Sequence, residues 1–459
     1  MLRRFYLIIL LLVTSHAGFC CASNPTDFIV NSATTDVNKT NGHLFDAIVA
    51  KDGSGDFNTV QSAINAAVTS PSRPYLIFIK NGEYDEMVLI PEEKSNIHLI
   101  GQDAKKTIIK HTLHSGSKND MFFEYSVNNP DADSYGRHAV VEVAAKDFYA
   151  ENITFMNTYG VQHQSGPQAL AIRSLTDRQS FHNCRFRSFQ DTWFTSPVDG
   201  DRQYVYDCYI EGAVDYLYGG GDILLEKCTF YNVRSGSVIT APCHQQATRF
   251  GYVMRDCIVD GNEKAADGRQ KLGRPWHNSP VTVYINTVMR IPIAPDGWSN
   301  MGAIPALFAE YNSTDIHGNA LNTSQRKTQY QYVERQTGDT IKGSCPSAID
   351  QQTASKYTYE NIIQARDGWN PRLLMKKTAA PQDLRYRKAS HTLSWKTVDE
   401  AIGYIIIDDN ERVVGTTKAC KIKVANPGKR LTVRPVSGSG SLGEPSSLQI
   451  DKTKDEPHL

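Results

Sequence analysis

A short strand motif recurs along the middle of this chain and constrains its fold more than any other feature. The motif is a polar residue followed by cysteine or isoleucine and then by alternating side chains. It occurs at residues 96–99, 152–155, 183–186, 207–210, 227–230 and 256–259. From Ile153 onward the spacings are 31, 24, 20 and 29 residues. Short strands repeated at such intervals are typical of a solenoid, in which each coil stacks on the previous one.

We therefore predict an all-β chain built on a right-handed parallel β-helix. The cysteines of the motif would stack inside it as a ladder of small apolar side chains. These cysteines are Cys184, Cys208, Cys228 and Cys257. Disulfides between neighbouring coils remain open from the sequence, as does a sandwich of unrelated strands.

A solenoid needs capped ends. Residues 59–68 are predicted to supply one cap, because apolar residues recur there at helical spacing from Val60 to Val68. Asn58, with Gln61 three residues further on, is predicted to form a capping box at the start of this helix.

The N-terminus has the pattern of a secretory signal peptide over residues 1–22. Two arginines precede an apolar run at residues 5–13, and small residues follow. The run is too short to span a membrane comfortably. We therefore expect a secreted or periplasmic protein with no membrane span in the mature chain. Phe19 stands directly before Cys20, where lipidation needs a small residue, so we expect no lipid anchor.

Three further segments are predicted. Residues 23–45 form an N-terminal linker, and residues 46–376 form the β-helix. A second domain follows at residues 380–455, where short strands recur at the intervals of a β-sandwich. Its pattern, with Trp395 and Tyr404, resembles a fibronectin type III module. The sequence is compatible with a spacer, a carbohydrate contact or a domain that packs on the β-helix, and we favour a spacer or packing role.

Charge and motif content exclude several classes of function. Lys+Arg and Asp+Glu are both 49, so the chain has no overall positive field with which to bind nucleic acid. It contains neither C-x-x-C nor H-E-x-x-H, so we expect no metal site. We expect a monomer.

Polar residues at coil spacing predict a compact site on one face. Gln168, Asp191 and Asp215 are separated by 23 and 24 residues, and residues one coil apart lie roughly 4.8 Å from each other. Two carboxylates that close cannot both ionise freely, so one pKa should rise while the other stays low. Such a pair supplies an acid and a nucleophile. By spacing alone, two solvated turn aspartates are an equal alternative.

The surrounding residues favour a functional site. Asp191 and Asp215 both lie among aromatic and apolar residues, where an aspartate is costly unless it is paired or used. The later motif Leu-Gly-Arg-Pro-Trp adds Arg274, which could hold one carboxylate ionised, and Trp276, on which a sugar ring could stack.

In their order along the chain, these motifs resemble those of pectin methylesterases of carbohydrate esterase family 8. The matching motifs lie at residues 52–57, 81–86, 167–171, 190–192, 214–219, 272–276 and 309–311. The resemblance implies hydrolysis of galacturonate methyl esters in pectin, giving methanol and a free carboxylate, with no metal or organic cofactor.

The resemblance also implies a role for each matched residue. Asp215 would be the nucleophile, and Asp191 would be the general acid and then the general base. Gln168 and Gln190 would donate hydrogen bonds to the oxyanion, and Arg274 would keep Asp215 ionised. The aromatic residues expected to contact the sugar are Trp276, Tyr218 and Trp298.

Other functions remain open from the sequence. A related β-helix esterase could act on another esterified uronide or acyl group. A pectin lyase or polygalacturonase would cut the chain itself, using calcium-binding acids or an acid pair flanking the glycosidic bond; the glutamines beside this acid pair suit an acyl intermediate better. A non-catalytic pectin-binding protein would be expected to lack one of the aspartates or the arginine.

Overall fold

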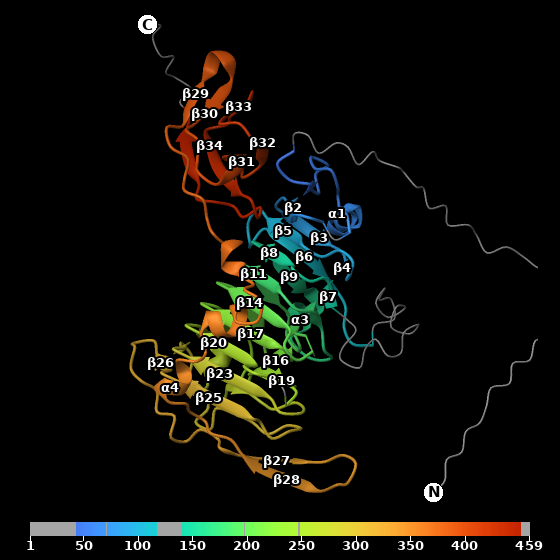
Figure 1. Ribbon diagram of the computed structural model, residues 1–459, viewed down its shortest axis with the longest axis vertical. Coiled ribbons are helices and arrows are strands. Elements are labelled where there is room, and N and C mark those ends of the chain that lie inside the picture. Colours follow the sequence, from blue (N-terminus) through green and yellow to red (C-terminus); the bar gives the residue numbers. More distant parts are fainter. Residues whose placement is uncertain (1–42, 70, 117–138, 197, 247, 451–459) are drawn as a thin grey trace, which may run out of the picture. The chain divides into compact units, whose positions relative to one another are not determined.

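The structure is a computed structural model. It describes residues 43–69, 71–116, 139–196, 198–246 and 248–450. Three parallel sheets wind around a common core (Figure 1), which confirms the predicted β-helix. The predicted signal peptide and most of the predicted linker lie outside the described residues.

Successive coils add strands to the three sheets in turn. The ten-stranded sheet contains β1 (Ala47–Val49), β2 (Tyr75–Ile79), β5 (Ile97–Gly101), β8 (Tyr149–Glu151), β11 (Gln179–His182), β14 (Arg202–Tyr206), β17 (Asp222–Glu226), β20 (Tyr252–Arg255), β23 (Val281–Ile285) and β25 (Leu307–Tyr311). The nine-stranded sheet contains β3 (Gly82–Asp85), β6 (Thr107–His111), β9 (Thr154–Asn157), β12 (Arg185–Arg187), β15 (Tyr209–Gly212), β18 (Thr229–Asn232), β21 (Ile258–Gly261), β24 (Val288–Met289) and β26 (Thr314–Asp315). The seven-stranded sheet contains β4 (Val88–Ile90), β7 (Ala139–Val143), β10 (Leu170–Ser174), β13 (Trp193–Phe194), β16 (Val214–Gly219), β19 (Val238–Pro242) and β22 (Lys271–Gly273).

The polar residue that opens each motif makes a tight corner. Asn152, Asn183, Asp207 and Asp256 have φ angles of 58, 48, 53 and 53°, a left-handed conformation that Asn and Asp tolerate better than most residues. Each turns the chain from the ten-stranded into the nine-stranded sheet. Asn96 has the same conformation, with φ 60°, but it leads into β5 of the ten-stranded sheet. The prediction that this motif is equivalent to the other five was therefore wrong. The same left-handed turn occurs at two different corners of a coil, so the turn alone does not show which sheet follows it.

The cysteines of the motif form the expected internal ladder. Cys184, Cys208, Cys228 and Cys257 are all buried with free thiols. The backbone N–H of Cys184 donates to Cys208 Sγ at 3.3 Å, and the Cys228 thiol donates to the Val205 carbonyl oxygen at 3.5 Å. The described cysteines form no disulfide, so packing and weak thiol hydrogen bonds connect the coils here.

Helix α1 (Val60–Ala66) packs against the first coils, as predicted, but its cap differs. The N-cap is Thr59, whose Oγ1 accepts the Ser62 N–H at 3.2 Å. The predicted capping box from Asn58 was wrong, because the Gln61 side chain binds the backbone of strand β4 instead.

None of the helices in the described part of the chain is long and apolar enough to cross a membrane.

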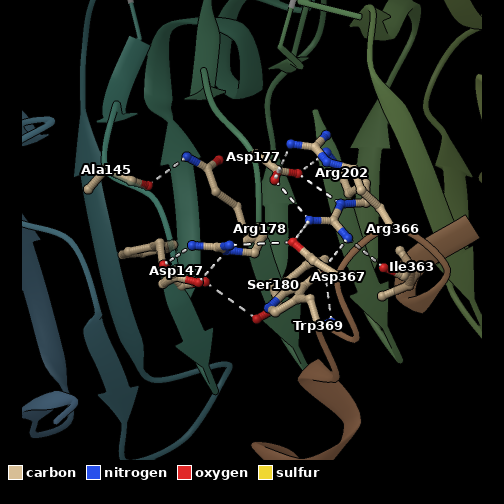
Figure 2. A network of polar contacts seen from close by, with 12 residues as sticks. Ala145, Asp147, Asp177, Arg178, Ser180, Arg202, Ile363, Arg366, Asp367 and Trp369 are labelled. Carbon is tan, nitrogen blue, oxygen red and sulfur yellow. Dashed lines mark hydrogen bonds and ion pairs between the residues drawn. The ribbon is translucent and has the colours of Figure 1, made fainter. Parts of the chain in front are cut away.

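After the last coil, a tail with short helical turns packs along the ten-stranded sheet. Its helical elements are α4 (Gln351–Ala354), η3 (Glu360–Gln364) and η4 (Pro371–Leu373). A network of ion pairs fixes it (Figure 2). Arg202 of β14 donates to both oxygens of the tail residue Asp367, each at 2.7 Å. It also donates to both oxygens of Asp177, at 3.0 and 2.9 Å. Every charge that is buried here therefore has a partner of opposite sign.

The C-terminal region forms the expected small β-sandwich from two antiparallel sheets. One sheet contains β29 (Arg385–Arg387), β30 (Thr392–Ser394) and β33 (Lys421–Lys423). The other contains β32 (Val413–Thr417), β31 (Ala401–Asp408), β34 (Arg430–Ser437) and β35 (Ser446–Gln449). Leu393 of the first sheet shares a core with Tyr404 and Val433 of the second, so the two sheets face each other.

Candidate active site

The seven-stranded sheet carries the two aspartates predicted to be catalytic. Asp191 lies just before β13, and Asp215 is the second residue of β16. These strands are neighbours, with Trp193 opposite Leu217, so the two aspartates lie one coil apart, as their spacing predicted. Both have left-handed backbones, with φ 60 and 49°. Aspartate tolerates this conformation, which turns both residues out of the regular strand pattern.

Arg274, directly after β22, holds Asp215 with one edge of its guanidinium group, through two N–H donors. Nε donates to Oδ1 at 2.8 Å and Nη2 donates to Oδ2 at 2.5 Å. This fork fixes the carboxylate in orientation as well as in charge. The sequence analysis missed a second cation, Arg234, whose positive charge also favours ionised Asp215. Arg234 follows Asp215 by about one coil of the repeat, and this spacing could have indicated that the two residues lie near each other.

The two carboxyl groups differ in their affinity for a proton. Burial raises the pKa of Asp215, while the hydrogen bonds and positive charge of Arg274 oppose that rise. Burial raises the pKa of Asp191 well above its ordinary value, and the negative charge of Asp215 raises it further. Asp191 therefore keeps a proton when Asp215 carries a charge. The expectation that one pKa would stay low was wrong, because burial raises the pKa of Asp215 as well, but the predicted asymmetry is present.

Gln168 and Gln190 are adjacent beside this pair. The N–H of Ala169, next to Gln168, donates to the Gln190 carbonyl oxygen at 3.1 Å. Gln190 forms a bridge with Val214, the residue before Asp215. Its side chain also hydrogen-bonds Asp191, and Gln168 is exposed. The Gln190 carboxamide thus lies where it can donate to charge that develops near the aspartates, and Gln168 lies beside Gln190, next to the residue that pairs with it.

The three predicted aromatic contacts differ in exposure. Trp276 is half-buried, and its ring packs against Tyr218 at 5.5 Å. Tyr218 is only 4% exposed and packs against Phe194 at 5.0 Å, so it supports Trp276 from beneath. Trp298 is 0% exposed and packs inside the β-helix against Phe308 at 4.8 Å. Predicting Trp298 as a substrate contact was therefore wrong, because its side chain points into the core.

Together these features define a class of protein: a parallel β-helix whose seven-stranded sheet carries an aspartate pair, an arginine fork and two carboxamides. The family model "Pectinesterase" matches residues 46–365. The chain belongs to the pectinesterase family.

Individual relatives agree with this assignment. The chain is 31% identical over 286 residues to "Probable pectinesterase/pectinesterase inhibitor 13" of Arabidopsis thaliana, covering 59% of this chain and 43% of that protein. It thus spans less than half the length of the first curated relatives it matches. The pectin methylesterase from carrot is 26% identical with a TM-score of 0.55, covering 70% of this chain and 93% of that one. PemA from Erwinia chrysanthemi, 23% identical with a TM-score of 0.55, covers 72% and 99% and supports the fold alone.

Proposed function

We propose that this protein is a pectin methylesterase, which hydrolyses galacturonate methyl esters in pectin to methanol and free carboxylate. One observation carries the proposal: Asp215, held by Arg274, lies one coil from Asp191, whose pKa is raised well above its ordinary value. Membership of the pectinesterase family supports the substrate class.

In the first half of the reaction, an Asp215 oxygen bonds to the ester carbonyl carbon. The carbonyl oxygen becomes an oxyanion, to which Gln168 and Gln190 donate hydrogen bonds. The bond to the methoxy oxygen then breaks, and Asp191 gives its proton to that oxygen, so that methanol leaves. The galacturonyl group remains bound to Asp215 as a mixed anhydride.

In the second half, Asp191 is a carboxylate and acts as a base. It takes a proton from a water molecule whose oxygen bonds to the galacturonyl carbon. Asp215 leaves as a carboxylate, stabilised again by Arg274, and Asp191 is again protonated. One water is consumed for each ester hydrolysed, and the half-buried Trp276 is proposed to stack on the sugar.

We further propose the arrangement of the whole chain. Residues 1–22 would direct the protein to the periplasm or the outside of the cell, where it would act as a monomer on pectin. Residues 46–376 would be the catalytic β-helix. Residues 380–455 would be a fibronectin type III-like module, a proposal supported by its two facing antiparallel sheets. Its role would be that of a spacer or a domain packed on the β-helix.

The test measures methanol, new reducing ends and unsaturated products in the same sample of highly methylated pectin. The proposal predicts methanol without chain cleavage. Chain cleavage without methanol would contradict it and favour a lyase or polygalacturonase. If none of the three products forms, the substrate is a different ester or the protein only binds pectin. The matched control is Asp215→Asn, which removes the proposed nucleophile and keeps the size of the side chain.

A further inference from the structure

One corner of the β-helix departs from the pattern of its neighbours. From β8 to β25, a residue with a left-handed backbone turns each coil from the ten-stranded into the nine-stranded sheet. At the other corners this residue is asparagine or aspartate, but after β17 it is Lys227, with φ 54°. Lysine adopts this conformation less readily than asparagine or aspartate does. The turn alone therefore does not explain why a lysine stands here.

The neighbouring corners show what asparagine contributes at this position. Asn183 Nδ2 donates to Asn152 Oδ1 at 2.7 Å. On the other side of Lys227, Asn286 Nδ2 donates to Asp256 Oδ1 at 3.0 Å. These side chains link successive coils along the edge. An asparagine at the corner after β17 would make the turn more readily and offer the same kind of link, so the property that only the lysine supplies is its charge.

The Lys227 side chain lines a pocket of about 400 Å³ at this edge. The pocket lies at the ends of β14, β17 and β20, which are neighbours in the ten-stranded sheet (Figure 1), and residues of the tail bound it on one side. Its lining residues are Tyr204, Tyr206, Glu226, Lys227, Asp256, Arg372 and Met375. A concave pocket of this size, with aromatic rings and a few polar groups, is typical of a small-molecule site. The two catalytic aspartates belong to the seven-stranded sheet, so this pocket is separate from them.

Two cations of the pocket keep donors available to a ligand. Lys227 is exposed, and its Nζ donates to the Tyr206 hydroxyl at 3.2 Å. Among the residues that the structure describes, Lys227 forms no ion pair. Arg372 donates through Nε to the Tyr204 hydroxyl at 3.0 Å and through Nη2 to Glu226 at 2.6 Å, while its Nη1 donates to no described residue. Both cations can therefore bind an added carboxylate.

The same pocket holds acceptors for hydroxyl groups. Asp256 is exposed, and its Oδ2 lies 3.9 Å from Arg255 Nε, which is too far for a hydrogen bond. The carboxylates of Glu226 and Asp256 balance the two cations, so the pocket has no excess of positive charge with which to hold a multiply charged phosphate. A ring with one carboxylate and several hydroxyls matches this mixture of donors and acceptors. The half-buried Tyr206 ring adds an apolar surface.

We propose that this pocket is a second, non-catalytic binding site, and that its ligand is a sugar acid. Lys227 and Arg372 bind the carboxylate, and Asp256 accepts hydrogen bonds from the ring hydroxyls. The class of ligand follows from the lining alone, whereas the choice of galacturonate as the sugar rests on the proposed function. A second contact of this kind raises the local concentration of polysaccharide at the protein.

The test follows the Met375 methyl group by NMR, in protein whose methionine methyl groups are isotopically labelled. Met375 lines the pocket, so its signal reports this site and not the aspartate pair. Met254, which is 0% exposed in the core, is the internal reference. Titration with sodium D-galacturonate should shift the Met375 signal to saturation and leave Met254 in place. D-galactose, which has ring hydroxyls but no carboxylate, should cause no saturating shift over the same range.

Three substitutions separate this pocket from general charge attraction. Lys227→Asn should raise the Kd read from Met375 about tenfold, as expected for a lost hydrogen bond to a charged group. Its fold and its methanol release from a short esterified oligosaccharide should not change, because asparagine suits the left-handed corner. Tyr206→Phe, which removes the hydroxyl that positions Lys227, should give a smaller rise. The matched control is Lys105→Asn, at an exposed lysine between β5 and β6 and outside the lining, which should leave the Kd unchanged.

Several outcomes would overturn the inference. They are a Met375 signal that does not move with galacturonate; an equal response to D-galactose or to inorganic phosphate; an unchanged Kd in Lys227→Asn; and an equal rise in Kd for Lys227→Asn and Lys105→Asn. Marked destabilisation by Lys227→Asn would also overturn it, because the lysine would then be needed to separate Asp207 from Asp256. Methanol release without a Met375 shift would defeat this inference alone. A Met375 shift without methanol release would support the pocket and defeat the proposed function.

Discussion

Two groups of aspartates and arginines lie at different sheets of the same β-helix, one around the buried Asp177 and the other around the buried Asp215, and they differ in charge balance. The network in Figure 2 joins aspartates of the coils and the tail to an equal number of arginines. Its members are Asp147, Asp177, Asp367, Arg178, Arg202 and Arg366. In the candidate site, Asp191 and Asp215 share Arg274, with Arg234 further away.

The difference in balance moves the pKa values in opposite directions. Burial alone would raise the pKa of Asp177, but its hydrogen bonds and charge interaction with Arg202 outweigh burial and lower it. In the candidate site, burial and the charge of Asp215 raise the pKa of Asp191 instead. A carboxylate with a full set of cationic partners stabilises the fold, whereas a carboxyl group beside a second acid retains a proton that can be used in catalysis.

The largest expected effect is on turnover. Asp215→Asn should lower kcat for methanol release by at least about 10⁴-fold, because a neutral amide cannot take the place of the carboxylate nucleophile. The fold should survive, since asparagine has the same size and also tolerates a left-handed backbone. Methanol assays and circular dichroism at matched protein concentration measure both effects. A variant that keeps most of its rate would show that Asp215 is not the nucleophile.

The next effect is on stability and tests the balanced network. Asp177→Asn should lower the free energy of unfolding at pH 7 by about 3 kcal/mol, because it removes a partner from the buried Arg202. Since the pKa of Asp177 is lowered in the folded state, its contribution is present above the unfolded value of about 3.9 and is lost as pH falls through the folded value. The gap between variant and unaltered protein should therefore shrink in acid. Denaturant unfolding at several pH values measures this difference in the free energy of unfolding. A difference that does not depend on pH would contradict the account.

The smallest effect has the opposite sign. Asp191→Asn should raise the free energy of unfolding at pH 7 by about 1 kcal/mol, because it replaces a carboxyl group whose ionisation is unfavourable in the folded state. The pKa of Asp191 is raised in the folded state. The destabilisation that it causes is therefore absent below the pKa of the unfolded state and grows as pH rises from there through the pKa of the folded state. Comparing this variant with Asp177→Asn in the same unfolding experiment tests the contrast directly. If both substitutions lower the free energy of unfolding, the contrast between the two groups is wrong.

The sequence predicted the features that depend on regular spacing. The cysteine motifs marked the coils, and the 24-residue step from Asp191 to Asp215 correctly placed these residues on adjacent coils. It could not predict features that depend on side-chain direction or distant contacts. Trp298 looked available, but it forms a bridge with Gly273 at the end of β22, and its side chain lies in the core. Asp367 and Arg202 lie 165 residues apart, and neither has a local pattern that would indicate the other.

The most direct test of the central claim is the pH dependence of kcat/KM for methanol release. With ionised Asp215 as nucleophile and protonated Asp191 as acid, the unaltered protein should show a bell-shaped profile. The acid limb would come from protonation of Asp215, and the alkaline limb from loss of the proton on Asp191. Asp191→Asn should have a much lower rate and no alkaline limb. An alkaline limb that persists unchanged in Asp191→Asn would contradict the assignment of Asp191 as the proton donor.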